Sequence, residues 1–377
     1  MERLALKPRE NWVELVEGLG MNYHTIDGEL YWDESACYRF TSAEIDILDI
    51  ATAELQQLCI EAAERVIREN LFSRLQIPER FVPLVINSWE RDEPSLYGRF
   101  DLAYDGKGPP KLLEYNADTP TSILEASVIQ WFWLRDRFPD ADQFNSIHEK
   151  LIASWQSWPC RQRGMLHFAC AAESAEDLGN LEYLRDTAIQ GGFPTRRLFM
   201  EDIGWDHSSR CFVDLQYDAI RTLFKLYPWE WLIREEFGPH LAETRITLIE
   251  PAWKMMLSNK GILPLLWEMF AGHPNLLEAT FDDRPLDGDY VRKPLLSREG
   301  GNILIHRRGE WIGTDGTYGE EGYVYQRYAP LPRFDGNYPV IGSWVIGGEP
   351  GGIGIREDRS EITSNCSRFI PHYFEEA

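Results

Sequence analysis

Two pairs of polar residues within residues 97–126 have the types and spacing to do chemistry. Arg99 and Asp101 are two residues apart, and so are Glu114 and Asn116 beyond a loop rich in glycine and proline. Side chains two residues apart lie on one face of a strand, so the segment predicts a hairpin that gathers a guanidinium, two carboxylates and an amide on one surface. Oxygen ligands of this kind suit Mg²⁺ that carries the phosphates of a nucleotide.

The turn of this hairpin suggests its register. Pairing Tyr104 with Lys111 places the two carboxylates opposite each other, and it also places Arg99 opposite Asn116. Like charges that face each other across a sheet are unfavourable by up to ~1 kcal/mol, and a bound cation would reverse that sign. An ordinary surface hairpin with an ion pair between Arg99 and a carboxylate fits the same spacing. The other face would pack inward and would carry Phe100, Leu102, Tyr104, Leu113 and Tyr115.

A second segment, residues 290–305, reads as strand, glycine loop and strand. It is not a Walker A loop, because it lacks G-K-[ST] and opens no helix. It could still cover phosphates, since glycines allow the backbone to approach closely and their N–H groups can bind anions. Lys293 would reach a phosphate from the strand before the loop, and Lys260 is a second candidate for the same work.

Two later segments have similar potential. Residues 323–330 read as an alternating strand, whose edge could hydrogen-bond an adenine through its backbone. Residues 345–358 are dense in glycine and close on Arg356, which two carboxylates follow directly. A local ion pair is the alternative for Arg356.

The elements that must position these residues follow from periodicity and turn signals. A capping sequence at residues 41–44 precedes a strong helical pattern, whereas residues 81–86 fit either a short strand or the end of a helix. Strands at 164–172 and 195–201 flank a helix at 182–190, and this β-α-β order predicts a parallel sheet. Further helices are expected at residues 12–19, 43–75, 123–138 and 251–271, the last broken near Gly261 and Pro264.

Composition bounds the classes of function. A chain of 377 residues is expected to form two or three domains. The net charge of −23 disfavours binding to nucleic acid or to an anionic membrane and would attract a cationic substrate, although solubility alone also explains it. The cysteines show no zinc spacing, and neither a signal peptide nor a membrane-spanning stretch is evident. We therefore expect a reduced, soluble, cytoplasmic protein.

Together these segments resemble the synthetase domain of the glutathionylspermidine synthase family. The likeness runs in order from residue 97 to residue 372. It is carried by R-x-D, E-Y-N-A-D, F-K-L-Y-P-W-E-W, S-N-K, K-P-L-L-S-R-E-G-G-N, Q-R-Y-A-P-L, G-I-R-E-D and S-R-F-I-P-H.

The resemblance implies an α/β (α+β) fold, a permuted ATP-grasp-like synthetase with a pre-ATP-grasp-type substrate domain and a glycine-rich lid. The permutation is suggested because the metal residues precede the lid. Three regions are expected. Residues 1–160 would be a helical region that also contains the Mg²⁺ and phosphate hairpin at 97–118, and residues 161–245 would form the α/β region on the substrate side. Residues 246–377 would bind the nucleotide and would include a lid at about 290–345.

The resemblance also implies roles for single residues. Asp101, Glu114 and Asn116 would hold Mg²⁺, and Arg99 would act in catalysis by stabilising charge on the transferring phosphoryl group. Thr119 and Thr121 stand near the substrate, where the family has serines. The residues implied to bind ATP are Arg99, Phe100, Asp101, Lys260, Lys293, Glu299, Gly300, Gln326, Arg327, Tyr328, Ala329, Arg356, Glu361, Ile362 and Thr363.

The activity that the resemblance implies is an ATP- and Mg²⁺-dependent acid–amine ligase that forms an amide through an acyl phosphate. Its partners would be a small carboxylate and an amine, of the peptide and polyamine kind. The acidic pair expected near the amine has no clear counterpart in residues 173–177, and the amidase domain of bifunctional relatives is absent. Two alternatives stay open: an ATP-binding or ATPase sensor or partner-binding protein that makes no ligase product, and a phosphotransferase that acts on a hydroxyl.

Overall fold

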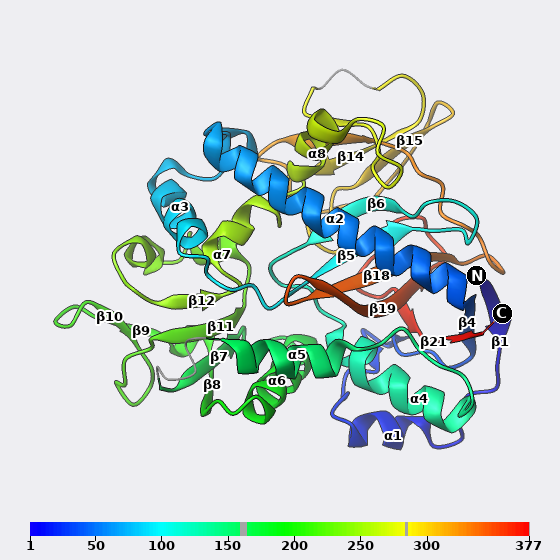
Figure 1. Cartoon of the computed structure of the whole chain (residues 1–377), viewed down its shortest axis with the longest axis horizontal. Coiled ribbons are helices and arrows are strands. Elements are labelled where there is room, and N and C mark those ends of the chain that lie inside the picture. Colours follow the sequence, from blue (N-terminus) through cyan, green and yellow to red (C-terminus); the bar gives the residue numbers. More distant parts are fainter. Residues whose placement is uncertain (159–163, 283–285, 377) are drawn as a thin grey trace.

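The computed structural model describes residues 1–158, 164–282 and 286–376. An antiparallel sheet of order β20-β19-β18-β5-β6 lies at the centre of Figure 1. The mixture of antiparallel and parallel sheets with covering helices confirms the predicted α/β class. The central strands are β5 (Tyr97–Ala103), β6 (Lys111–Asn116), β18 (Tyr338–Ile346), β19 (Glu349–Asp358) and β20 (Arg368–Ile370).

The predicted hairpin is the β5–β6 pair, and its functional register is confirmed. Asp101 lies opposite Glu114, and Arg99 lies opposite Asn116. The pairing beside the turn differs from the prediction, because Lys111 pairs with Ala103 and not with Tyr104. A bulge corrects the difference of one residue within the ladder.

The bulge also reverses one prediction about the inward face of the hairpin. Leu112 pairs with Leu102 and is buried, whereas Leu113 lines a cavity. The remaining predicted inward residues, Phe100, Leu102, Tyr104 and Tyr115, are buried as expected.

A parallel sheet of order β12-β11-β7-β8 stands beside the central sheet. The predicted β-α-β unit is confirmed, because β7 and β8 pair in parallel and α6 joins them. Helix α6 begins seven residues earlier than predicted, at a Ser174 cap. The bounds are β7 (Leu166–Cys170), α6 (Ala175–Gln190), β8 (Thr195–Phe199), β11 (Thr222–Leu226) and β12 (Thr247–Ile249).

A second antiparallel sheet, β13-β17-β14-β15-β16, carries the predicted glycine loop between β14 and β15. We call residues 295–303 the lid loop. The strands are β13 (Ala279–Thr280), β14 (Tyr290–Pro294), β15 (Leu304–Arg307), β16 (Glu310–Gly313) and β17 (Tyr323–Arg327).

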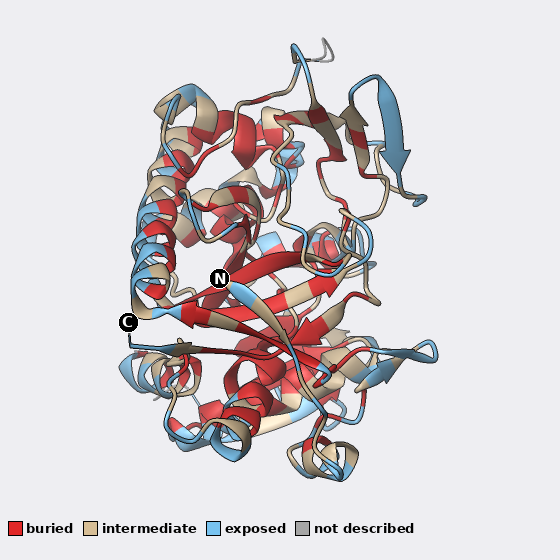
Figure 2. Ribbon diagram, turned by 90° about the vertical axis from the view of Figure 1, so that its right-hand side faces the viewer, coloured by how far each residue is buried: buried red, intermediate tan, exposed pale blue. Residues whose placement is uncertain are grey.

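The long helix α2 (Ser42–Arg68) crosses the molecule, with one stripe buried and the other exposed (Figures 1 and 2). The predicted cap at its start is a complete capping box: Thr41 Oγ1 accepts from the Glu44 N–H, and the Glu44 carboxylate accepts from the Thr41 N–H. The helix ends earlier than predicted, and a 3₁₀ turn follows at Phe72–Leu75.

The other helices test the remaining predictions. Residues 81–86 are helical: Phe81 ends a 3₁₀ turn (Glu79–Phe81), and the rest belong to α3 (Val82–Glu90). Pro264 does not break α8 (Ile262–Phe270), because it lies in the first turn, where its missing N–H has no helical partner to lose. The remaining bounds are α1 (Trp12–Gly18), a π-helical turn (Glu125–Ile129), α4 (Gln130–Arg137), α5 (Ile147–Ser157), a 3₁₀ turn (Ala252–Met256) and α7 (Trp229–Leu232).

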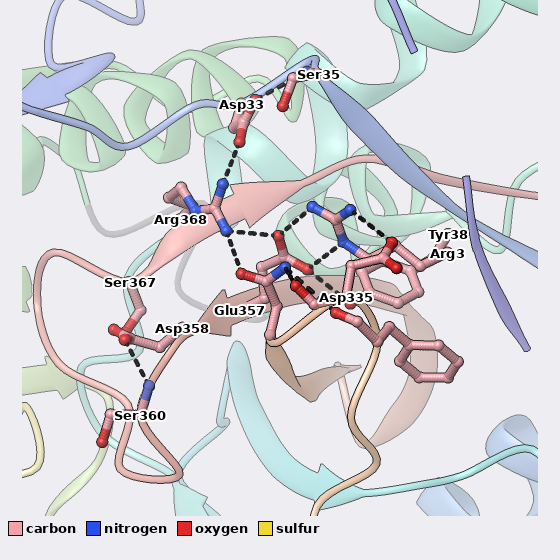
Figure 3. Close-up of polar contacts among 12 residues, drawn as sticks. Arg3, Asp33, Ser35, Tyr38, Asp335, Glu357, Asp358, Ser360, Ser367 and Arg368 are labelled. Atoms are coloured by element: carbon pink, nitrogen blue, oxygen red, sulfur yellow. Dashed lines mark hydrogen bonds and ion pairs between the residues drawn. The ribbon is translucent and has the colours of Figure 1, made fainter. Parts of the chain in front are cut away.

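The two ends of the chain meet in one small sheet, in which β4 (Ala36–Thr41) lies between β1 (Glu2–Ala5) and β21 (His372–Glu375). A buried ionic cluster supports this junction (Figure 3). The Glu357 carboxylate of β19 accepts from Arg3 at 2.8 and 2.9 Å, from the Tyr38 hydroxyl at 2.7 Å and from Arg368 at 2.8 Å.

The predicted division into three regions remains a prediction, and its boundary at 160/161 lies outside the described residues. The two large hydrophobic clusters of the described residues do not follow that division, since both gather side chains from early, middle and late parts of the chain. No helix of residues 1–158, 164–282 or 286–376 combines the length and apolar character needed to cross a membrane.

Candidate active site

A cavity of about 470 Å³ lies where the β5–β6 hairpin, the lid loop and the start of α6 meet. Most residues singled out in the sequence line it. They are Arg99, Asp101, Glu114, Asn116, Thr119, Thr121, Lys260, Lys293, Glu299, Gly300, Gln326, Arg327, Tyr328, Ala329, Arg356, Glu361, Ile362 and Thr363.

Phe100 is the predicted site residue that does not line this cavity. Its side chain is fully buried on the opposite face of β5, where it stacks on Tyr115 with ring centres 4.0 Å apart. Alternation along a strand accounts for this placement. The side chain of Phe100 therefore supports the hairpin from behind.

The polar side chains of the hairpin converge as their spacing predicted. Arg99 Nε and Nη2 donate to the Asp101 carboxylate at 2.7 and 3.1 Å. The Asn116 amide donates to Asp101 Oδ2 and to Glu114 Oε1, both at 3.2 Å. One amide thus touches both carboxylates.

The two predicted lysines reach the same point. Lys260 Nζ lies 3.1 Å from Glu114 Oε2 and donates to the Ser297 carbonyl at 2.6 Å. Lys293 Nζ donates to the Leu113 carbonyl and to Gln326 Oε1, both at 2.8 Å. The lysines therefore connect the hairpin with the lid sheet.

The electrostatics of this end of the cavity follow from the same contacts. Burial favours the neutral form of Glu114, but Lys260 and Lys293 outweigh it and hold the pKa of Glu114 at about 2. Burial lowers the pKa of Lys293 to about 8 against the attraction of Glu114. An anionic carboxylate and two cations are thus concentrated in a partly dry site.

The donor set fits Mg²⁺ and phosphate. Hard oxygen donors suit Mg²⁺, and rotation of the Asn116 side-chain amide would turn its oxygen to the point between the carboxylates that its nitrogen now occupies. In the described part of the chain no three His, Cys, Asp or Glu side chains form a metal cluster, so a metal ion bound here would need this amide as its third ligand. The lysines supply the positive charge that phosphates need.

Arg356 adds a further anion-binding group. Its Nη2 donates to the Ser364 carbonyl, while its Nε is buried without a hydrogen-bond partner among the described residues. An unpaired buried donor favours an anionic ligand. A local ion pair, the alternative open from sequence, is not among the contacts formed within residues 1–158, 164–282 and 286–376.

The lid loop packs closely against residues 361–363, which the resemblance implies to bind ATP. Gly300 has a φ of +70°, and a Cβ at this position would collide with the Thr363 carbonyl. Arg307 of β15 binds Glu361 at 2.6 Å and the Tyr328 hydroxyl at 2.9 Å. These contacts bring residues 361–363 beside residues 326–329, as the resemblance implied.

Strand β17 is not the free edge that the sequence suggested. It pairs with β13 on one side and with β14 on the other. The Arg327 and Tyr328 N–H groups donate to the Glu278 and Asp289 carbonyls at 2.7 and 3.1 Å. An adenine would therefore meet the backbone beyond the end of the strand, near Ala329.

A buried ion pair of Glu250 and Lys254 lies behind the hairpin. Glu250 accepts from the N–H groups of Leu96 and Tyr97 at 2.9 and 3.1 Å. Its partner Lys254, 3.5 Å away, donates to the carbonyls of Tyr97 and Ala117 at 3.2 and 3.1 Å. The pair thus holds the start of β5 and the end of β6 together.

Three further carboxylates, which were given no role from the sequence, line the same cavity: Glu173, Glu176 and Asp177. They lie at the carboxyl end of β7 and in the first turn of α6. Burial and the neighbouring Glu176 raise the pKa of Asp177 to about 7, and burial also raises the pKa of Glu176. The available signal was their position directly after a parallel strand, where ligands bind in α/β sheets.

Comparison with known proteins decides the family. The family model described as "Glutathionylspermidine synthase preATP-grasp" matches residues 3–375. The chain belongs to this family. A Haemophilus influenzae protein named "Putative acid--amine ligase" is 43% identical, with 99% of this chain and 100% of the relative covered.

Two longer relatives extend the comparison. The bifunctional glutathionylspermidine synthetase/amidase of Escherichia coli is 28% identical over 96% of this chain and 63% of its own length. The trypanothione synthetase of Crithidia fasciculata is 29% identical over 84% of this chain and 53% of its own length. The chain thus spans little more than half of these two relatives. Its family is one of acid–amine ligases and synthetases, enzymes that form carbon–nitrogen bonds.

A solved structure from Methylobacillus flagellatus, titled "Putative gamma-glutamylcysteine synthetase", aligns over 83% of each chain at 10% identity. Its TM-score of 0.42 is too low to support an argument about this chain.

Proposed function

We propose that this chain is an ATP- and Mg²⁺-dependent acid–amine ligase that forms an amide bond through an acyl phosphate. A substrate carboxylate would take the γ-phosphoryl group of ATP, and an amine would then displace phosphate from the acyl carbon. The observation that carries the proposal is the lining of one cavity, which gathers the two lysines, the Asp101–Glu114–Asn116 trio and three further carboxylates, Glu173, Glu176 and Asp177.

At the phosphate end, the side chains of the chain would mainly position groups and stabilise charge. Arg99 is fixed by Asp101 and by the Thr121 carbonyl, to which its Nη1 donates at 2.8 Å. It would face the charge that develops on the transferring group. Mg²⁺, when bound, would supply further neutralisation of the phosphate oxygens. The lid loop would keep water from the acyl phosphate.

Glu173, Glu176 and Asp177, which line the same cavity, would bind a cationic amine. An amine must lose a proton before it can attack, and a carboxylate with a pKa near 7, as in Asp177, is suited to accept that proton. The net charge of −23 would also draw a cationic amine toward the protein.

Glutathione and spermidine are the first probes, because the name of the E. coli relative contains both. Thr119 and Thr121 line the cavity at positions where the resemblance predicts serines. The acid that this chain uses is therefore proposed only as a small carboxylate. Glutathione or a related peptide carboxylate fits the class.

The binding of nucleotide tests the phosphate end directly. Calorimetric titration of the purified protein with ADP should show binding that requires Mg²⁺. Asp101→Asn and Glu114→Gln should weaken the Mg²⁺-dependent binding by at least about tenfold, since each loses a charged metal ligand. Thr41→Ala, a change in a remote helix cap, should leave binding unchanged. Wild-type binding in both carboxylate variants would refute the metal assignment.

A further inference from the structure

A buried ion pair joins the hairpin to the opposite wall of the cavity. Asp118 is 1% exposed, and Lys225, near the end of β11, is fully buried. Lys225 Nζ donates to Asp118 Oδ1 at 2.6 Å, and the Trp229 N–H donates to Asp118 Oδ2 at 2.8 Å. Both carboxylate oxygens of Asp118 therefore bind the segment that leads from β11 into α7.

Lys225 is held from further directions. Its Nζ donates to the Tyr227 carbonyl at 3.0 Å and lies 4.7 Å from the centre of the Trp229 ring. A buried ammonium with a carboxylate, a carbonyl and an aromatic face around it has little freedom to move. The distance between Asp118 and Trp229 is therefore fixed.

Thr119 follows Asp118 and Glu230 follows Trp229. Both contact Arg298 of the lid loop. Arg298 Nη1 donates to Thr119 Oγ1 at 2.8 Å. Arg298 Nε and Nη2 lie 2.9 and 2.7 Å from Glu230 Oε1. The contacts close a ring that runs Asp118–Thr119–Arg298–Glu230–Trp229 and returns to Asp118.

The geometry of Arg298 makes this ring sensitive to spacing. A guanidinium is planar and presents its N–H groups in a fixed fork. Its two acceptors, Thr119 and Glu230, come from different elements, so they fit the fork only if those elements keep their separation. A hydrogen bond of this kind weakens steeply once the donor–acceptor distance exceeds about 3.5 Å.

We propose that Asp118 and Lys225 are positioning residues: their buried pair holds Thr119 and Glu230 at the spacing that Arg298 needs and so keeps the lid loop docked over the cavity. Neither Asp118 nor Lys225 is among the residues that line the cavity. The inference rests on the proposed function only in treating this cavity as the active site.

Hydrogen–deuterium exchange of the full chain without ligand tests the inference. Asp118→Asn and Lys225→Met should accelerate exchange of the lid loop by about tenfold, the effect of losing a charged hydrogen bond. The matched control is Glu34→Gln, which weakens another buried pair, since Glu34 is 3% exposed and binds Arg9. The control should lower the melting temperature and leave exchange of the lid loop unchanged.

The double variant Asp118→Asn/Lys225→Met separates positioning from general stability. Removing both members of a buried pair restores much of the stability that removing one costs. Exchange of the lid loop should nevertheless stay fast in the double variant. If the double variant regains both stability and the wild-type exchange rate of the lid loop, the inference is overturned. It is also overturned if neither single variant changes the exchange rate of the lid loop.

Glu230→Ala keeps the test open if the single variants do not fold, because the Glu230 side chain is less deeply buried and its loss removes one side of the ring. It should also accelerate exchange of the lid loop, and an unchanged rate would overturn the inference. The measurement needs no substrate. Failure of the protein to make an amide would therefore contradict the proposed function without altering this result.

Discussion

At the scale of single residues, spacing predicted the hairpin but not its bulge. Arg99, Asp101, Glu114 and Asn116 face one another because alternation along paired strands is strict. The bulge beside Leu113 depends on tertiary packing, which the local sequence does not encode. Glu176 and Asp177 were missed for a related reason: the role proposed for them depends on their burial beside a cavity, and the sequence of a charged helical turn does not reveal burial.

Lys293 gives a prediction about pH. Its pKa of about 8 lies below the usual 10.5, so above pH 8 the folded protein without ligand carries it mostly neutral. Phosphate binding would require the charged form, and ATP should therefore bind with uptake of a proton above pH 8. Calorimetry of ATP binding in buffers of different ionisation enthalpy measures this uptake. Lys293→Met should remove it, and equal heats for the wild type in all buffers would contradict the role of Lys293.

Lys293 also affects how stability depends on pH. A lysine whose pKa is raised by an ion pair loses its stabilising effect as pH rises, whereas the pKa of Lys293 is lowered. Between its pKa of about 8 in the folded protein and 10.5 in the unfolded chain, the unfolded chain binds more protons. This group therefore makes the free energy of unfolding rise with pH across that window.

Asp177 predicts a trade between stability and function. Its pKa of about 7 exceeds the usual 3.8, so the folded protein binds more protons between these values and loses stability as pH rises through them. Asp177→Asn should therefore raise the melting temperature above pH 7 and have little effect below pH 3.8, while it impairs use of the amine. Thermal melts at both pH values test this. A lower melting temperature of the variant above pH 7 would contradict the assignment.

At the scale of elements, the β-α-β unit and the capped helix α2 were predictable because their signals are local: periodicity, a capping box and flanking turns. The start of α6 was not, because Ser174 caps it within a stretch of short polar residues that fits a loop equally well. Strand β17 was predicted as an edge, yet the β13 strand that covers it spans only Ala279–Thr280 and leaves little pattern to read.

Two helix caps provide a matched comparison at this scale. Ser174 Oγ accepts from the Asp177 N–H at 3.1 Å, and Thr41 Oγ1 accepts from the Glu44 N–H at 3.3 Å. Ser174→Ala and Thr41→Ala should each cost about 1 kcal/mol of stability. Only Ser174→Ala should change the pH profile of ADP release, because it alone alters the hydrogen bonds around Asp177. Identical pH profiles would show that the start of α6 takes no part in the reaction.

At the scale of the whole molecule, the sequence predicted the family and the class of fold, but not how the parts meet. The cavity is assembled from three sheets, and the ends of the chain close on each other through the Glu357 cluster (Figure 3). Within the cluster, the contacts of Glu357 with Arg3 and Tyr38 join residues more than 300 positions apart, and no local sequence pattern predicts them.

The Glu357 cluster makes a prediction about global stability. Glu357→Leu would leave Arg3 and Arg368 buried or half-buried without their shared carboxylate. Loss of one partner of a buried ion pair costs about 3–5 kcal/mol, so the midpoint of urea unfolding should fall markedly. An unchanged midpoint would mean that the cluster does not hold the two ends of the chain together.

The central claim, that one cavity transfers phosphate to an acid and then joins that acid to an amine, is tested most directly by the source of oxygen in the released phosphate. The purified protein would turn over Mg²⁺-ATP in ¹⁸O-labelled water with a small-molecule cell extract as the supply of acids and amines. We predict unlabelled phosphate, because its oxygen comes from the acid, and a new compound whose mass is that of an acid plus an amine less one water. Phosphate that carries solvent oxygen with no such compound, or a phosphorylated product without free phosphate, would contradict the account.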